Sequence, residues 1–155
     1  MQNQAVAWGL ALAMTLFSIA SLRAAECDAP VTDLQLIKPS QSVSSQSAAF
    51  SGDWSGSFAF NRPGGYENVV QCVKMRISVK DNQRAEIGYC TGSLAIMSRE
   101  PKCFRYDGTI NGSTLGVTTT SGAHLVVHIN GGGSASAEFT TSQGNKSYGR
   151  FSKAQ

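Results

Sequence analysis

The sequence lacks an excess of charge of either sign. Thirteen Lys and Arg stand against ten Asp and Glu, a net charge of +3, far below the excess that marks a dedicated nucleic-acid-binding protein. The low net charge and the 41% of apolar residues also argue against a disordered chain. The sixteen glycines follow no G-X-Y period, so the chain is not collagen-like and has many tight turns. Its 155 residues are enough for one globular domain.

Charged side chains are absent from the first 22 residues. Residues 5–20 are predominantly apolar, and small residues follow at Ala20, Ser21, Ala24 and Ala25, a pattern typical of a secretory signal peptide. An uncleaved membrane anchor is the alternative, but the run is shorter than the roughly 20 apolar residues that a spanning helix needs. We therefore expect a signal peptide over residues 1–25, no membrane span after cleavage, and a secreted or periplasmic protein.

Helical periodicity is lacking after residue 50, where apolar and polar residues alternate between short turn signals. One example is Val73, Met75 and Ile77 against Lys74 and Arg76. Alternation predicts strands, and many short strands with glycine-rich turns predict a barrel or a sandwich. We expect an all-β domain over residues 50–155, an antiparallel meander of about eight strands that closes into a barrel. A two-layer sandwich is the alternative.

The segment before this domain, residues 26–49, contains no glycine and is rich in serine and glutamine. Such a composition buries little surface, so we predict a flexible linker. Within it, Leu34, Leu36 and Ile37 are candidates for one short turn or edge strand before Pro39.

The four cysteines form no C-x-x-C pair and are spaced too widely for zinc ligands, so no metal is expected. An even number of cysteines in an exported chain predicts two disulfide bonds. Folding the chain back at Asp81 places Cys72 opposite Cys90 on the polar face, which would leave Cys27 to pair with Cys103. A bridge between Cys90 and Cys103 is also open.

Signs of catalysis are few. No serine lies in a G-x-S-x-G elbow, and the disulfides leave no cysteine as a nucleophile. His124 and His128 share one face of a predicted strand, roughly 13 Å apart and on its polar side. The basic residues of the polar faces alternate with acidic ones, which favours an ordinary solvated wall over a nucleic-acid site. We expect no enzyme, no cofactor and no nucleic acid as a partner.

The first strand of the domain contains Gly52-Asp53-Trp54 and resembles the first strand of the secreted lipocalin- and avidin-like (calycin) β-barrels. The resemblance implies that Trp54 closes the barrel floor and that a basic residue in or after the last strand packs on it, for which Arg150 is the candidate by position. Avidins build their biotin site from several tryptophans, whereas Trp54 is the only one left after signal cleavage. Ser121-Gly122-Ala123-His124 is also similar to the Ser-Gly-x-x-Tyr loop of periplasmic lysozyme inhibitors, with Leu125 in place of the tyrosine.

Two kinds of binding function remain. In the first, which we expect, surface turns contact a protein partner, as in an inhibitor or an envelope interaction protein. The candidate contacts are Gly131-Gly132-Gly133 at one barrel end, and Ser121, Gly122 and His124 at the other. In the second, the barrel carries a small apolar ligand. The interior side chains that would bind it are Trp54, Phe58, Phe60, Tyr106 and Phe139. A filled core favours the first function, and a cavity of several hundred Å³ favours the second.

Overall fold

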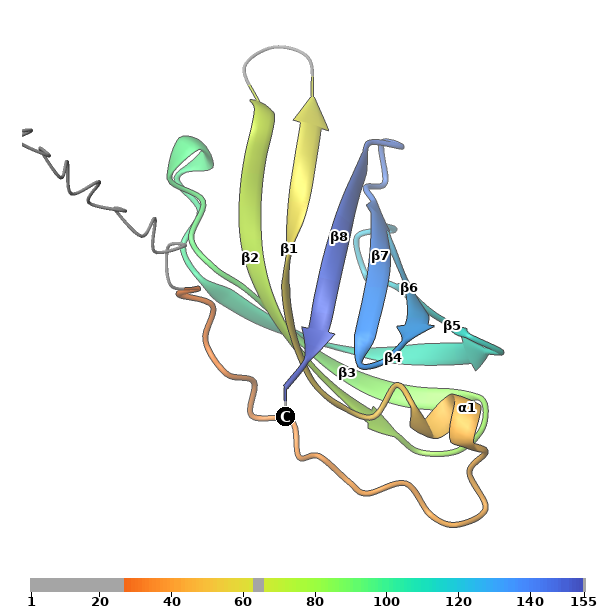
Figure 1. The fold of residues 1–155 in the computed structure, drawn as a ribbon. Coiled ribbons are helices and arrows are strands. Elements are labelled where there is room, and N and C mark those ends of the chain that lie inside the picture. The colour runs from red at the N-terminus through yellow and green to blue at the C-terminus, as the bar shows by residue number, and fades with distance from the viewer. Residues whose placement is uncertain (1–26, 63–65, 155) are drawn as a thin grey trace, which may run out of the picture.

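The computed structural model describes residues 27–62 and 66–154, so the predicted signal peptide lies outside it. Strands that are neighbours in sequence pair antiparallel, and the last pairs with the first to close a barrel (Figure 1). The predicted all-β, eight-stranded meander barrel is confirmed, and the sandwich is wrong. The strands are β1 (Gly52–Arg62), β2 (Tyr66–Val79), β3 (Arg84–Thr91), β4 (Lys102–Asn111), β5 (Thr114–Thr118), β6 (His124–Gly131), β7 (Ser134–Thr140) and β8 (Lys146–Lys153).

Two short helical segments accompany the strands. Helix α1 (Ser45–Ala48) precedes β1, and its N-cap Ser44 accepts a hydrogen bond from the Ser47 backbone N–H. The 3₁₀ turn η1 (Ala95–Met97) lies in the connection from β3 to β4. Among the residues described, no helix is long and apolar enough to cross a membrane.

The alternation seen in the sequence decides which side chains face inward. In β2, Val73, Met75 and Ile77 are at most 2% exposed, whereas Lys74 and Arg76 lie on the outer face. Buried apolar side chains fill the barrel end where β1 begins, beside α1, and include Phe50, Trp54 and Ile77. We call this the closed end. The connections β3–β4, β5–β6 and β7–β8 lie at the opposite, open end (Figure 1).

The outer wall neutralises most of its own charge. The Arg76 guanidinium donates to both Asp53 carboxylate oxygens, at 2.6 and 2.9 Å. Lys80 lies 3.2 Å from Glu86, and Lys146 lies 2.7 Å from Glu138. Two of these pairs connect neighbouring strands, and Lys80, the residue after β2, pairs with Glu86 of β3, so much of the basic character of the wall is balanced locally.

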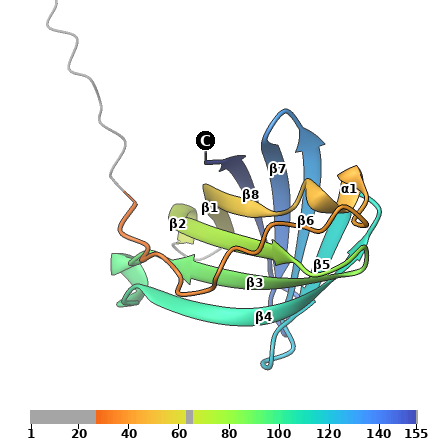
Figure 2. The ribbon, with the colours of Figure 1, turned by 90° about the horizontal axis from the view of Figure 1, so that it is seen from below.

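Residues 27–44 form a segment, here called the strap, that runs along the outside of β2 and β3 (Figure 2). Ala29 and Leu34 are buried. A Cβ atom on Gly88 of β3 would collide with Thr32 of the strap, so the strap approaches the sheet as closely as glycine allows. This part of the predicted linker therefore packs against the barrel wall, and Leu34, Leu36 and Ile37 form neither a turn nor a strand.

Both predicted disulfide bonds form, but with a different pairing from the one we expected. The bonds join Cys27 to Cys72 and Cys90 to Cys103, with Cα atoms 5.5 and 4.0 Å apart. In the β2–β3 pair, Cys90 lies opposite Lys74 rather than Cys72, because the turn is centred one residue later than Asp81. Cys90 is instead directly opposite Cys103 in β4, and Cys72 bonds the strap. Two disulfides indicate an oxidising compartment.

Candidate ligand-binding cavity

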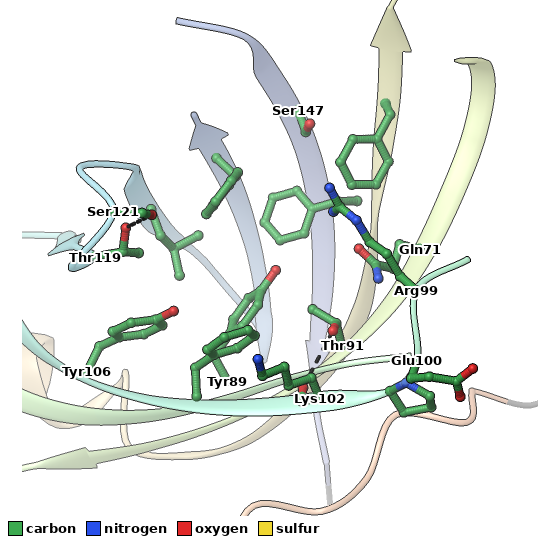
Figure 3. A pocket seen from close by; sticks show the side chains of 16 residues that line it. Gln71, Tyr89, Thr91, Arg99, Glu100, Lys102, Tyr106, Thr119, Ser121 and Ser147 are labelled. Atoms are coloured by element: carbon green, nitrogen blue, oxygen red, sulfur yellow. Dashed lines mark hydrogen bonds between the residues drawn. The ribbon is translucent and has the colours of Figure 1, made fainter. Parts of the chain in front are cut away.

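A cavity of about 490 Å³ occupies the open end of the barrel (Figure 3). Its walls are mainly aromatic, with a few hydroxyl and amide groups, and charged residues stand at the mouth. The lining residues are Phe58, Phe60, Gln71, Tyr89, Thr91, Arg99, Glu100, Pro101, Lys102, Phe104, Tyr106, Thr119, Ser121, Leu125, Phe139 and Ser147.

Four of the five predicted interior residues line this cavity: Phe58, Phe60, Tyr106 and Phe139. The fifth, Trp54, belongs to the packed core of the closed end and does not line it. Trp54 lies near the start of β1, whereas Phe60 lies near its other end.

The resemblance suggested Arg150 as the cation beside Trp54, and this assignment is wrong. Arg150 points outward and lies opposite Ser57. Lys153, which pairs with Trp54 across the β1–β8 closure, places its Nζ 5.3 Å from the centre of the Trp54 ring. Alternation along β8 puts Phe151 inside and Arg150 outside, and the end of the strand lets Lys153 fold over the ring.

The aromatic side chains form two groups in the cavity wall. On the β1, β7 and β8 side, Phe58 packs edge to face against Phe139 and Phe151, with ring centres 6.3 and 5.4 Å apart. On the β3 and β4 side, Phe104 stacks on Tyr106 at 6.0 Å. Aromatic pairs prefer such edge-to-face and stacked arrangements, so the neighbouring rings stabilise one another in the cavity wall.

Two phenol groups bring hydrogen-bonding capacity into this apolar space. Tyr89 is 8% exposed and Tyr106 half-buried, and neither hydroxyl has a hydrogen-bond partner among the side chains and backbone that the structure describes. Burial raises the pKa of both hydroxyls, so they stay protonated at neutral pH. They are therefore available as donors to a bound molecule.

The other polar groups of the lining hold the cavity wall together. The Gln71 side chain donates to the Gly92 carbonyl at 2.8 Å, which fixes the start of the β3–β4 connection. The hydroxyls of Thr119 and Ser121 are 2.9 Å apart, and the Ala123 N–H donates to Thr119 Oγ1.

The proposed surface contacts lie at both barrel ends. Ser121 and Gly122 form the β5–β6 turn at the open end, where Ser121 lines the cavity. His124 is exposed on the outer face, with Nδ1 3.1 Å from the Thr118 hydroxyl. The Gly131-Gly132-Gly133 turn lies at the closed end, away from the cavity. Among the described residues, no group of three His, Cys, Asp or Glu side chains could hold a metal ion.

Sequence reasoning missed several lining residues. Tyr89 has the same inward parity as Ile87, and Lys102 the same parity as Phe104 and Tyr106, so alternation alone could have found both. Arg99 lies in the β3–β4 connection, and no local sequence pattern shows that this connection folds over the mouth of a cavity.

The fold and the cavity together define a closed, disulfide-bonded antiparallel barrel with one open end. Among solved structures, the chain is similar to a de novo designed fluorescence-activating β-barrel, at a TM-score of 0.54 and 14% identity over 72% of this chain and 100% of the design. It is also similar to a redesigned β-barrel, at a TM-score of 0.56 and 12% identity over 71% of this chain and 96% of the other.

These similarities concern the fold alone. No family model matches the chain, and no curated protein matches it in sequence. At the level of barrel architecture the fold agrees with the calycin-like resemblance, while the family relation suggested by Gly52 and Trp54 stays a prediction.

Proposed function

We propose that this protein is an exported, non-catalytic binding protein that holds a small, largely apolar ligand inside the open end of its barrel. The observation that carries the proposal is the cavity of about 490 Å³ in a barrel whose other end is densely packed. Ligand pockets are typically about 300–1,000 Å³, mostly apolar, with few polar groups that orient the ligand. The aromatic walls and the two phenol donors fit this description.

From the sequence alone we expected a protein that binds through its surface turns, and we now favour the ligand carrier. The cavity favours the carrier over a protein that acts only through its surface turns. The surface alternative predicts a stoichiometric protein partner bound through Ser121, Gly122 and His124. Co-purification with such a partner, and no bound small molecule, would support that alternative.

The test is a cavity-filling substitution with a matched control on the same strand. Ser147 of β8 is buried, lines the cavity and lies opposite Phe60 and Phe139. Ser147→Phe should therefore abolish saturable binding of the neutral dye N-phenyl-1-naphthylamine, measured by its fluorescence. Ser152→Phe adds the same ring to the outer face of β8 and should bind the dye like the wild type.

Thermal unfolding and circular dichroism of each variant check that the barrel is intact. Should Ser147→Phe not fold, Thr91→Phe fills the same cavity from β3. A folded cavity-filled variant that binds the dye as tightly as Ser152→Phe would refute an interior site.

A further inference from the structure

We propose that the ligand is an anionic amphiphile, with an acidic group bound by Arg99 and Lys102 at the mouth and an apolar body among the aromatic walls. This inference rests on the proposed function and adds the chemical class of the ligand. Three observations support it: the Arg99 and Lys102 side chains point toward the cavity, bonds within the chain hold the β3–β4 connection, and the described interior lining is uncharged.

The charges at the mouth are mostly positive on the cavity side. Figure 3 shows the side chains of Arg99 and Lys102 directed toward the cavity and that of Glu100 directed away from it. In β4 the alternation places Lys102 on the same face as Phe104 and Tyr106, both of which line the cavity.

These two cations differ from the four paired cations of the outer wall, although Lys74 and Arg150 of that wall also have no carboxylate within salt-bridge distance among the described side chains. Arg76, Lys80, Arg105 and Lys146 each lie within 3.6 Å of a carboxylate oxygen. Among the side chains described, no carboxylate lies within salt-bridge distance of Arg99 or Lys102; Lys102 Nζ instead lies 5.3 Å from the Phe104 ring centre. An anion at the mouth would therefore gain two positive partners without breaking an ion pair seen here.

The β3–β4 connection, which carries Arg99 and leads into Lys102 at the start of β4, is held by contacts within the chain. Leu94 and Arg99 exchange backbone hydrogen bonds of 2.9 and 3.2 Å around η1. The Cys90–Cys103 disulfide joins the two strands at the base of the connection. A preformed site loses less conformational entropy on binding, so this arrangement suits recognition of a fixed headgroup.

The interior sets the position of the acidic group. Apart from the rim, the lining residues that the structure describes include no charged side chain, and a buried charge without a partner is costly. A carboxylate or sulfonate is thus excluded from the depth of the cavity and is stable at the mouth, where water and two cations meet it. Among the described lining residues, the only carboxylate that a cationic ligand could meet is that of Glu100, which points away from the cavity.

The test compares two dyes of closely related shape. N-phenyl-1-naphthylamine is neutral, and 1-anilinonaphthalene-8-sulfonate has the same ring system with an added sulfonate. The oxidised wild-type protein should bind the sulfonate dye more tightly than the neutral one. In Arg99→Gln/Lys102→Gln the sulfonate dye should bind on the order of tenfold more weakly, the loss expected for a charge-assisted contact, with neutral-dye affinity unchanged.

A charge-matched control separates contact from overall charge. Lys38→Gln/Arg150→Gln removes two exposed cations outside the cavity and should leave both dyes bound as in the wild type. Added salt should weaken only the sulfonate dye. If neither dye binds the wild type, the proposed function fails. If the neutral dye binds but the sulfonate dye is affected equally by both double variants, the cavity stands and the anionic class is refuted.

Competition experiments with the neutral dye identify the apolar part of the ligand. Laurate and 2-naphthoate are each compared with the matching alcohol for displacement of the neutral dye. Stronger displacement by laurate than by dodecanol indicates a linear chain, and stronger displacement by 2-naphthoate than by 2-naphthol indicates an aromatic body. Either result supports the proposal when Arg99→Gln/Lys102→Gln removes the advantage. Acids that displace no better than their alcohols overturn it.

Discussion

Trp54 connects three parts of the closed end. Its side chain is 2% exposed, and its Nε1–H donates to the Phe50 carbonyl at 2.9 Å just before β1. Lys153 covers the ring and also donates to the Ala49 carbonyl at 3.1 Å. One aromatic residue thus joins the approach to β1, the start of β1 and the end of β8.

Trp54→Ala should lower the free energy of unfolding by about 3–5 kcal/mol, because it removes a buried aromatic ring and leaves a cavity. The matched change is Phe104→Ala at the open end. Phe104 is 36% exposed, so its truncation should cost clearly less. Denaturant unfolding of both variants measures the difference, and equal losses would show that the closed end is not the more stable part.

At the scale of elements, the two disulfides act on different parts of the fold. Cys90–Cys103 spans a sequence separation of 13 and closes the connection that forms the cavity rim. A loop of similar length gives a stabilisation of about 3 kcal/mol in the chain-entropy model. Cys27–Cys72 instead fixes the beginning of the strap to the outside of β2.

Tryptic digestion of the denatured, unreduced protein should reveal this pairing directly. Lys38 and Arg62 both precede proline, so trypsin leaves Cys27 and Cys72 in one peptide that ends at Lys74. The peptide of residues 85–99 should be linked to residues 103–105, and only this pair should separate on reduction. Mass spectrometry that finds Cys72 linked to the 85–99 peptide would contradict the structure.

The elements show where sequence reasoning succeeds and where it fails. Period-two alternation gave the strands and the inward phenylalanines because it depends only on neighbouring residues. The disulfide pairing depends on register, and shifting the turn centre past Asp81 by one residue moves every β2–β3 pair by two. The strap has a polar composition, yet packs because Gly88 leaves room for Thr32, a contact between distant residues.

At the scale of the whole molecule, three carboxylates in separate places stabilise the fold in their charged form. Hydrogen bonds from the side chain and backbone of Ser93 lower the pKa of Asp28. Hydrogen bonds from the Gln83 backbone N–H and the Arg84 side chain lower the pKa of Asp81. A hydrogen bond from the Lys146 side chain lowers the pKa of Glu138. They join the strap, the β2–β3 turn and the β7–β8 pair.

The melting temperature should therefore fall when the solution is made acidic. A carboxylate whose pKa is lower in the folded state stabilises the fold above its unfolded pKa, about 4, and this contribution is lost as the pH falls through the folded value. We expect little change from pH 7 to 5 and a decline below pH 4. Asp81→Asn should reduce that decline, whereas an unchanged melting temperature down to pH 2.5 would contradict these linkages.

The existence of the cavity could not be read from composition. The predicted aromatic residues are compatible with a filled barrel. Whether they surround a cavity depends on how the closed barrel distributes its bulky side chains, and Trp54 and Phe50 both belong to the packed core. Arg99 lies in the β3–β4 connection, and the position of that connection depends on the Gln71 hydrogen bond and on the Cys90–Cys103 disulfide. Such long-range effects arise from the assembled barrel.

The pairing of β1 with β8 has a consequence for biogenesis. As the chain emerges, β1 to β7 can add to the sheet one after another, but β1 keeps an unpaired edge until β8 arrives. The same strand delivers Lys153 to Trp54. A nascent chain stalled before β8 would present two open edges and an uncovered tryptophan, a template for aggregation. The arrival of β8 is thus the step that turns a vulnerable open sheet into a self-contained molecule.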